Sequence, residues 1–289
     1  MTVVWIDGKY TDRANATVSV FDHGLLYGDG VFEGIRVYDH TVFRLGAHMD
    51  RLYDSAKAIW LEIPIPKAEF TAVVKEAVAR SGLTNAYIRL VVTRGVGDLG
   101  LDPRKCPKAC AICIVDTIAL WAPDRYEKGL VCQSAATPIA HRENLSPRIK
   151  SLNYLAHILA KVEGISAGVD EVLMLDAGGF VAEASGMNVF AVRGRRLRTP
   201  PEWAGILRGV TRDAVMQLAA EAGYVAEEYP LTRYDLYTAD EVFLTGTAAE
   251  VVGVRRIDGR AIGSGVTGPV TRDLMSRFKD LVRREAAGA

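Results

Sequence analysis

Residues 148–154 read Arg148-Ile149-Lys150-Ser151-Leu152-Asn153-Tyr154 and mark the point where a strand-like segment gives way to a helix. Two further strings lie downstream, Val181-Ala182-Glu183-Ala184-Ser185-Gly186 and Thr245-Gly246-Thr247-Ala248-Ala249-Glu250. One lysine indicates little, because most lysines are solvated surface charges. A lysine followed by an acid and by two loops bearing hydroxyl groups and glycine has the parts of a pyridoxal phosphate site. The amine attaches the cofactor, the acid pairs with the pyridinium nitrogen and the loops hold the phosphate.

The composition sets broad limits on the class of protein. A chain of 289 residues is long enough for one large domain or two ordinary ones, each with its own core. Apolar residues make up 49% and charged residues 24%, as in ordinary soluble globular proteins. The 35 basic and 35 acidic residues balance, so nothing favours a polyanionic partner such as nucleic acid.

The N-terminus and the apolar runs bear on the location of the protein. Residues 1–9 predict a strand and a turn, without the basic start, apolar stretch and cleavage site of a signal peptide. No apolar run approaches the length of a membrane span. We therefore expect a cytoplasmic protein without a membrane partner.

Among the four cysteines, Cys110 and Cys113 have the C-x-x-C spacing of a redox site or of half a zinc site. Residues 109–115 are also one apolar run, which is typical of a buried strand. No second Cys/His pair stands at zinc-finger spacing, and no helical pattern follows directly as in a thioredoxin-like site. We interpret the pair as part of a strand and expect no bound metal.

The first part of the chain alternates strand and helix patterns. Extended segments are expected at residues 17–21, 31–38, 87–93 and 109–115. The spacing of apolar residues predicts helices over 45–59 and 70–78, the second ending near Ser81-Gly82. Residues 94–104 form a long loop with three glycines and a proline, of a kind that often carries function. Its glycines fit G-x-G-x-x-G, but a strand follows instead of a helix, so we reject a dinucleotide site.

A second pattern begins after residues 119–128, which lack a clear period, contain a proline and are the best linker candidate. Strands are expected there at 130–134, 171–175, 180–182, 188–192, 224–229 and 241–244. Helices are expected at 211–222, at 270–284 and along a stripe formed by Leu152, Leu155, Leu159 and Val162. The sequence predicts two α/β domains: a small N-terminal domain over residues 1–118, a linker over 119–130 and a larger C-terminal domain over 131–289.

Two segments have features of a phosphate site. Leu207-Arg208-Gly209-Val210-Thr211-Arg212 leads into an amphipathic helix, where a glycine turn exposes unpaired N–H groups and the positive end of the helix dipole. Thr211 could add a hydroxyl donor, although threonine also caps helices routinely. The string at Thr247 follows an apolar strand, where small residues let a ligand approach the backbone; a plain turn would have the same sequence.

Glu183 and Lys150 complete this set. An acid opposite the pyridine nitrogen keeps that nitrogen protonated, so the ring can accept electrons from the substrate Cα–H bond. A solvated glutamate at a strand end is the ordinary alternative. A free lysine has a pKa of about 10.4, and burial beside apolar walls or a cationic ring would lower it. Each feature has an ordinary explanation alone, but their occurrence together and in this order favours a cofactor site.

The chain resembles the class IV aminotransferases, which are fold-type IV pyridoxal phosphate enzymes, and is most similar to the branched-chain amino acid aminotransferases. The resemblance covers nearly the whole chain. It rests, in the family's order, on Tyr27-Gly28-Asp29-Gly30, Val31-Phe32-Glu33-Gly34-Ile35-Arg36, His48-Met49-Asp50-Arg51-Leu52-Tyr53-Asp54-Ser55-Ala56, Tyr87-Ile88-Arg89, and the Lys150, Glu183, Gly209 and Thr247 strings. It implies a mixed α/β fold with a small N-terminal domain and a larger C-terminal pseudo-barrel domain. It also implies a homodimer or higher homo-oligomer.

The resemblance implies roles toward pyridoxal 5′-phosphate. Lys150 would hold the cofactor covalently and would later shuttle the proton as the catalytic group. Glu183 would pair with the pyridine nitrogen, and Tyr154 would hydrogen-bond the ring oxygen. The phosphate would be bound by Arg51, Leu207, Gly209, Val210, Thr211 and Thr247. Arg51 also fits an exposed charge on an amphipathic helix.

Substrate roles are implied in the same way. Tyr27, Phe32 and Tyr87 would line a side-chain pocket, with Arg36 also at the substrate. The α-carboxylate would lie near Gly34, Thr247 and the amides of Ala248 and Ala249, and Arg89 would accept the second carboxylate of glutamate. Apolar walls with a few donors can accept both kinds of side chain. Tyr87 and Arg89 also fit plain strand alternation, and the loop 95–104, similar to the family's archaeal-type variant, would reach the partner subunit's site.

Two positions depart from the family's pattern, since Leu90 replaces a common proline and Met187 a common polar residue. The resemblance implies transamination of L-leucine, L-isoleucine and L-valine with 2-oxoglutarate, giving branched-chain 2-oxo acids and L-glutamate. Alternatives with the same fold are a D-amino acid or (R)-amine transaminase and an aminodeoxychorismate lyase, which residues 31–36 with Tyr87 and Arg89 disfavour. In a further alternative, a non-catalytic α/β binding protein, Lys150 is an ordinary charge.

Overall fold

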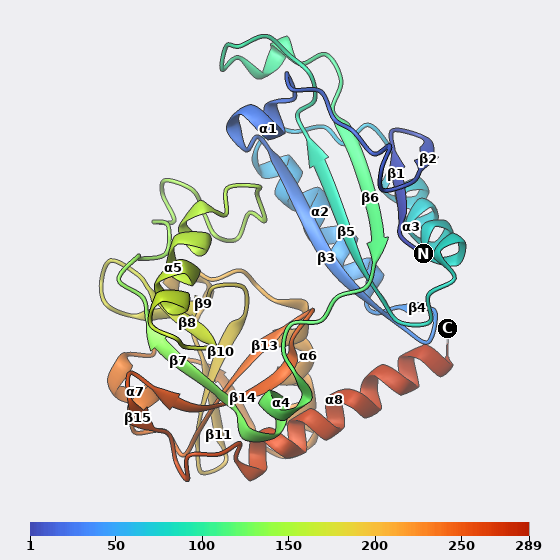
Figure 1. Ribbon diagram of the computed structural model, residues 1–289. Helices are drawn as coiled ribbons and strands as arrows, with labels where there is room; N and C mark the ends of the chain where they lie inside the picture. The colour runs from blue at the N-terminus through green and yellow to red at the C-terminus, as the bar shows by residue number, and fades with distance from the viewer. Residues whose placement is uncertain (289) are drawn as a thin grey trace. The chain divides into compact units, whose positions relative to one another are not determined.

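The computed structural model describes residues 1–288, which form two compact units (Figure 1). Unit 1 consists of Met1–Ile118, the short segment Ile149–Asn153 and the C-terminal segment that begins at Val282. Unit 2 consists of Ala119–Arg148 and Tyr154–Leu281. The contacts therefore group Lys150 with unit 1, whereas the expected ranges put it with the rest of residues 131–289.

Unit 1 is built on an antiparallel sheet. Within the described chain its six strands run in the order β2-β1-β6-β5-β3-β4. The strands are β1 (Val3–Ile6), β2 (Lys9–Thr11), β3 (Gly30–Tyr38), β4 (Thr41–Val42), β5 (Ala86–Thr93) and β6 (Cys110–Asp116). The helices are α1 (His23–Tyr27), α2 (Leu45–Ala58), α3 (Lys67–Ser81) and the 3-10 helix η1 (Pro103–Lys105).

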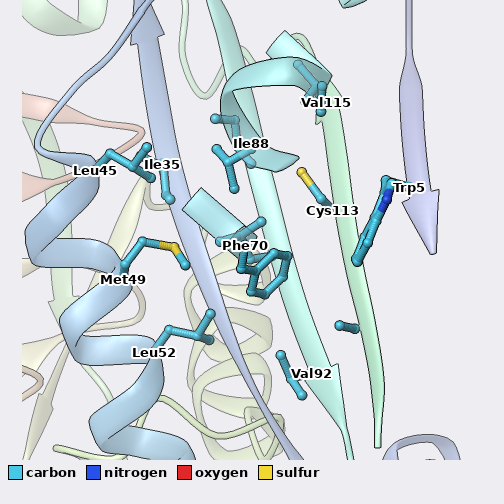
Figure 2. Packing of buried hydrophobic residues seen from close by; sticks show 14 of the residues in the cluster. Trp5, Ile35, Leu45, Met49, Leu52, Phe70, Ile88, Val92, Cys113 and Val115 are labelled. Atoms are coloured by element: carbon cyan, nitrogen blue, oxygen red, sulfur yellow. The ribbon is translucent and has the colours of Figure 1, made fainter. Parts of the chain in front are cut away.

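Helices α2 and α3 pack against the buried face of this sheet. Met49 and Leu52, spaced for one face of α2, are buried beside β3, and Figure 2 shows them pointing toward the sheet. Phe70 of α3 packs on Trp5 of β1 with 5.8 Å between ring centroids. Helix α3 ends at Gly82, whose φ of 65° is left-handed and suits glycine. Both expected helices are confirmed.

Side-chain alternation decides which face of β5 meets these helices. The residues at 86, 88, 90 and 92 are buried, whereas Tyr87 and Arg89 are half-buried on the opposite face. The side chain of Leu90, at a position where a proline is common in the family, packs in the core. The strand expected at 87–93 is confirmed, and its second face remains available for other roles.

The segment Ile149–Asn153 runs beside β3 although it lies far along the chain. The Phe32 amide donates to the Lys150 carbonyl at 2.9 Å, and the Leu152 amide donates to the Gly30 carbonyl at 2.9 Å. The Lys150 amide donates to Ser55 Oγ on α2 at 3.1 Å. These bonds satisfy the backbone of the segment and hold the lysine on unit 1.

Unit 2 contains a mixed sheet of nine strands within residues 1–288, in the order β12-β11-β10-β13-β14-β7-β8-β9, with β15 paired to β14. The pairs β11–β12, β14–β7 and β7–β8 are parallel and the other pairs antiparallel. The strands are β7 (Leu130–Ser134), β8 (Glu171–Leu175), β9 (Val181–Ala184), β10 (Asn188–Arg193), β11 (Arg196–Thr199), β12 (Val225–Glu228), β13 (Glu241–Gly246), β14 (Glu250–Ile257) and β15 (Arg260–Ala261).

The helices of unit 2 follow the expected pattern, with some exceptions. They are α4 (Pro123–Lys128), α5 (Leu155–Ser166), the 3-10 helix η2 (Glu202–Ala204), α6 (Val210–Glu221), α7 (Arg233–Tyr237) and α8 (Pro269–Ala287), whose last turns group with unit 1. The core includes Phe190 and Phe243, which face each other across β10 and β13 with ring centroids 4.8 Å apart. The expected strands and helices of the second half are confirmed within a few residues at their ends.

Three local expectations differ from the structure. Residues 17–21 form no strand, because no neighbouring strand pairs with them and Val20 and Phe21 are exposed. The segment expected as an irregular linker ends in helix α4, which starts at a proline, a residue suited to the first helical turn. Leu152 belongs to the segment beside β3, so the helix starts only at Leu155, and its apolar stripe is exposed.

Residues 1–288 contain no helix long and apolar enough to cross a membrane, and no group of three or more His, Cys, Asp or Glu side chains that could hold a metal ion. Cys110 and Cys113 are free cysteines on β6, which confirms the strand interpretation. Burial raises the pKa of both thiols to about 12, so neither is a reactive thiolate near neutral pH.

Candidate active site

In unit 1, Lys150 lies over the ring of Phe32, with Nζ 4.4 Å from the ring centroid. The backbone bond between the same two residues sets this position, because it holds the lysine segment against β3. The aromatic face carries partial negative charge and attracts a cation. Phe32, from the string Val31–Arg36, therefore lies directly beneath the lysine amine.

Five expected substrate residues share one face of the unit 1 sheet: Phe32, Gly34, Arg36, Tyr87 and Arg89. Gly34 pairs with Arg89 and Arg36 with Tyr87 across β3 and β5. The Arg89 guanidinium carbon lies 4.7 Å from the Phe32 ring centroid and 5.5 Å from that of Tyr87. A Cβ at Gly34 would lie 1.9 Å from Tyr87 Oη, so only glycine lets the tyrosine cross the strand here.

Arg36 and Tyr27, the sixth expected substrate residue of unit 1, have further contacts of their own. Arg36 follows Gly34 by two on the same strand face, and its guanidinium lies 5.1 Å from the Tyr38 ring centroid. Tyr27, on α1, donates its hydroxyl to the carbonyl of Leu99 at 2.6 Å. This bond ties Tyr27 to the loop 94–104 that sequence analysis singled out.

Arg51 was expected to bind the cofactor phosphate, and in the structure its side chain is paired with Glu33. Arg51 Nε donates to Glu33 Oε1 at 2.6 Å and Nη2 donates to Oε2 at 2.9 Å. His48 Nδ1 lies 2.8 Å from Glu33 Oε2. Glu33 points from β3 toward α2, opposite to the face that carries Phe32. This buried acid fixes the direction of the arginine head group.

For each of Glu33 and His48, burial and the hydrogen-bonded neighbours shift the pKa in opposite directions. Burial alone would raise the pKa of Glu33, but the charge of Arg51 and the hydrogen bonds from His48 and Arg51 lower it to about 2. Burial lowers the pKa of His48 below its usual value, in spite of the hydrogen bond to Glu33. At neutral pH the cluster is therefore a carboxylate, a guanidinium and a neutral imidazole.

In unit 2, Glu183 is a buried acid on β9 with one carboxylate oxygen fully engaged. Oε2 accepts from the Leu207 amide at 3.0 Å and from Asn188 Nδ2 at 3.3 Å. Oε1 accepts no hydrogen bond within the described residues, and His157 Nε2 lies 3.7 Å from it. An acid held in this way is oriented by the backbone and keeps one oxygen for a further donor.

The start of α6 lies directly beside this acid. Asn188 Nδ2 donates to the Leu207 carbonyl at 2.8 Å, and a Cβ at Gly209 would lie 2.1 Å from Asn188 Oδ1. Gly209 is the N-cap of α6, and no side chain of residues 1–288 caps the helix, so its first amides lack a side-chain acceptor there. Thr211 is buried in the first turn. Leu207, Gly209, Val210 and Thr211 are thus brought together with Glu183.

The turn at Thr247-Ala248-Ala249 connects β13 to β14 at the same end of the sheet, because Thr245 pairs with Asn188. Glu250 closes this turn with a left-handed φ of 60°. Met187, unusual for the family, is buried, and a Cβ at Gly246 would lie 2.9 Å from its Cγ. Met187 therefore packs under the turn and does not add a polar group.

Tyr154 caps the start of α5, and its ring stacks on His157 with 4.5 Å between centroids and 21° between planes. His157, Asn188 and the pair of Glu33 and His48 were not expected from the sequence as site residues. Glu33 stood between the expected residues Phe32 and Gly34, and Asn188 at the start of an expected strand, each as a polar residue among apolar neighbours. His157 gave no signal, because a histidine on an exposed helix stripe is common in sequences.

Comparison with known proteins identifies the family. Residues 30–257 match the family described as amino-transferase class IV. The chain is 52% identical over 278 residues to a putative branched-chain-amino-acid aminotransferase of Methanocaldococcus jannaschii, covering 96% of each protein. It is 40% identical over 291 residues to the branched-chain-amino-acid aminotransferase of Pseudomonas aeruginosa, covering 97% of this chain and 92% of the relative. The chain belongs to the class IV aminotransferases, as its sequence pattern indicated.

Solved structures agree with this assignment. The branched-chain amino acid aminotransferase from Escherichia coli matches with a TM-score of 0.95 and 35% identity, over 98% of this chain and 95% of that one. The enzyme from Thermobaculum terrenum, in its pyridoxal phosphate (holo) form, matches with a TM-score of 0.87 and 30% identity, over 98% and 94%. The expected mixed α/β fold of the fold-type IV enzymes, with two sheets, is confirmed.

Proposed function

We propose that this protein is a branched-chain amino acid aminotransferase that uses pyridoxal 5′-phosphate. It would move the amino group of L-leucine, L-isoleucine or L-valine to 2-oxoglutarate, giving the branched-chain 2-oxo acid and L-glutamate. The relatives named above carry this activity in their names. The single observation that carries the proposal is the carboxylate of Glu183, buried, fixed through Oε2 and open at Oε1.

The residues of unit 2 fit this cofactor. A carboxylate oxygen without a hydrogen-bonded donor suits a protonated ring nitrogen, and the uncapped amides of α6 with the Thr211 hydroxyl suit a phosphate. Only glycine at position 209 lets the helix start lie this close to Asn188, because an added Cβ would meet Asn188 Oδ1 at 2.1 Å. We assign the ring nitrogen to Glu183, the ring oxygen to Tyr154, and the phosphate to Leu207, Gly209, Val210, Thr211, Thr247 and Arg51.

When bound, the cofactor serves as the electron sink for breaking the substrate Cα–H bond. Lys150 carries the proton between the substrate Cα and the cofactor, acting as acid and base in both half-reactions. The Phe32 ring and the backbone bonds to β3 and α2 hold its amine in one place. Glu183 keeps the ring nitrogen protonated, which the electron sink requires.

We assign the dual substrate range to the face of unit 1 around Arg89. Phe32 and Tyr87 offer apolar surface to a branched side chain, and Arg89, stacked over both rings, offers a cation to the second carboxylate of glutamate. Tyr27 and Arg36 extend this substrate surface. Gly34 and the turn at Thr247, Ala248 and Ala249 are assigned to the α-carboxylate.

We further propose that the protein is cytoplasmic and forms a homodimer or higher homo-oligomer. Helix α5 exposes Leu155, Ile158, Leu159, Val162 and Ile165, an apolar stripe that a second copy would cover. In unit 1, the loop 94–104 exposes Leu99 and Leu101. Sedimentation of the purified protein measures its oligomeric state, and a monomer at micromolar concentration would contradict the proposed homo-oligomer.

A substrate panel tests the proposed activity. The purified holoenzyme is assayed with L-leucine, D-alanine and an (R)-amine, each with 2-oxoglutarate as acceptor. We expect a yellow protein that is active on L-leucine. Activity on D-alanine or the amine with none on L-leucine would refute the substrate assignment. A protein that stays colourless after addition of pyridoxal 5′-phosphate would refute the cofactor assignment as well.

A further inference from the structure

His157 is placed between two residues that we assign to the cofactor. Its ring stacks on Tyr154, and its Nε2 lies 3.7 Å from Glu183 Oε1. The side chain is 13% exposed, whereas the neighbouring Leu155, Ile158 and Leu159 of α5 are exposed. Tyr154 and His157 are three residues apart, which puts both on one face at the start of the helix. This position has no role in the assignments made so far.

The two ring nitrogens of His157 have different surroundings. Nδ1 is buried and has no hydrogen-bond partner within residues 1–288. A neutral imidazole carries its proton on one nitrogen only. A proton on Nδ1 would be a buried donor without an acceptor, which costs about 1–3 kcal/mol, whereas a proton on Nε2 faces the carboxylate of Glu183. The geometry therefore favours the tautomer with Nε2–H directed at Oε1.

The two oxygens of the Glu183 carboxylate are held differently. Oε2 accepts hydrogen bonds from the Leu207 amide and Asn188 Nδ2. Oε1 accepts none within residues 1–288, and His157 Nε2 faces it at 3.7 Å. A separation of 3.7 Å is longer than a hydrogen bond, and bonds of this kind commonly tighten when a ligand binds.

We propose that His157 is a positioning residue for the aminotransferase reaction: its Nε2–H orients the free oxygen of Glu183 toward the cofactor's ring nitrogen. This inference rests on the proposed cofactor role of Glu183. The stack on Tyr154 holds the imidazole plane, so one side chain links the residue assigned to the ring nitrogen with the residue assigned to the ring oxygen. His157 itself is not assigned a contact with substrate.

Two substitutions separate the donor from the ring. His157→Phe keeps the aromatic stack on Tyr154 and removes the donor, whereas His157→Gln keeps a donor at the reach of Nε2 and removes the ring. His141→Phe, the same change at an exposed histidine of unit 2, is the control. The readouts are the visible absorption spectrum of the bound cofactor, its dissociation constant, and kcat and KM for L-leucine.

We expect H157F to shift the visible absorption and to lower kcat about tenfold, the size of one lost hydrogen bond to a charged group, with KM changed less than about threefold. H157Q and H141F should stay within about threefold of the wild type and keep its spectrum. An H157F enzyme that matches the wild type overturns the proposal. So does an H157Q enzyme as impaired as H157F, because the ring and not the donor would then matter.

A measurement on the unsubstituted protein covers the case in which H157F does not fold. Proton–nitrogen correlation spectra of protein labelled with ¹⁵N-histidine, assigned by the loss of one signal in H157Q, report the tautomer of His157. We expect the proton on Nε2, and a proton on Nδ1 overturns the proposal. The tautomer and the absorption spectrum do not depend on the amino acid used, so a failure with L-leucine alone refutes the substrate assignment and leaves this test intact.

Discussion

Lys150 and Phe32 are joined twice, through a backbone hydrogen bond of 2.9 Å and through the approach of Nζ to 4.4 Å from the ring centroid. The backbone bond places the lysine, and the ring contributes an attraction of about 0.5–1 kcal/mol to its ammonium form. Strand β3, which carries Phe32, thus supports Lys150, the residue that we assign as the catalytic acid and base.

Replacing Lys150 with alanine removes the amine that attaches the cofactor and moves the proton. We expect loss of the visible absorption of the purified protein and a fall in transaminase activity of at least about a thousandfold. Borohydride reduction of the wild type followed by peptide mass mapping should place the reduced adduct on Lys150. Lys128→Ala, at an exposed lysine of α4, is the control and should change neither readout. An adduct on another residue would contradict the assignment.

Replacing Glu33 with glutamine leaves Arg51 without its buried counter-charge. Breaking such a pair costs roughly 3 kcal/mol of unfolding free energy. We also expect weaker cofactor binding, because Arg51 loses its bidentate support. Urea unfolding and cofactor titration measure the two effects. Glu62→Gln, at an exposed glutamate, should be close to neutral, and equal stability of both variants would show that the cluster is not structural.

The same acid makes stability depend on pH. The folded pKa of Glu33 is lowered from 4.5 to about 2, so its stabilising effect is complete above pH 4.5 and is lost as the pH falls toward 2. The lowered pKa of His48 acts in the same direction, beginning as the pH falls through about 6.5. We expect the melting temperature of the wild type to fall on acidification below pH 6.5, and that of E33Q to fall less between pH 4.5 and 2. Parallel curves would exclude a role for Glu33.

Adding a methyl group at Gly34 displaces Tyr87. The Cβ would lie 1.9 Å from Oη, so the ring has to leave its place beside Arg89. We expect kcat/KM for L-leucine to fall at least about tenfold in Gly34→Ala while the absorption of the bound cofactor is kept. Gly46→Ala is the matched control, because no atom of residues 1–288 beyond its chain neighbours and its own helix backbone lies within 4 Å of its Cβ, and alanine favours the helix. Unchanged kinetics in G34A would remove Tyr87 from the substrate surface.

Replacing Arg89 with leucine should affect the two substrates, 2-oxoglutarate and L-leucine, to different extents. The lost cation matters for 2-oxoglutarate, which carries a second carboxylate, and not for leucine. We expect the KM for 2-oxoglutarate to rise about 10- to 100-fold, while the KM for L-leucine stays within about threefold. Each substrate serves as the control for the other in the two half-reactions. An equal rise for both would mean that Arg89 supports the fold of the site and does not select the substrate.

Periodicity in the sequence predicted most helices and strands correctly, but it did not show which segments pair with which strands. The stripe of α2 and the alternation of β5 predicted helix and strand because both bury one face. Residues 17–21 have the composition of a strand, yet no strand pairs with them, and a ladder needs a neighbour. Leu152 continues the helix stripe in sequence, but its amide is bonded to Gly30 on β3. In each case a long-range hydrogen bond, or its absence, decided the outcome.

The chemistry of the strings around Lys150, Glu183, Gly209 and Thr247 indicated a pyridoxal phosphate site, and the resemblance of these and the earlier strings to the class IV aminotransferases indicated the family. The tertiary structure alone decided which groups hold these residues in place: Glu33 behind Arg51, Asn188 behind Glu183, and His157 between Glu183 and Tyr154. Glu33 and Arg51, Asn188 and Glu183, and His157 and Glu183 each come from two different elements. Contacts between separate elements act over a few ångströms of space, and no spacing along the chain reports them.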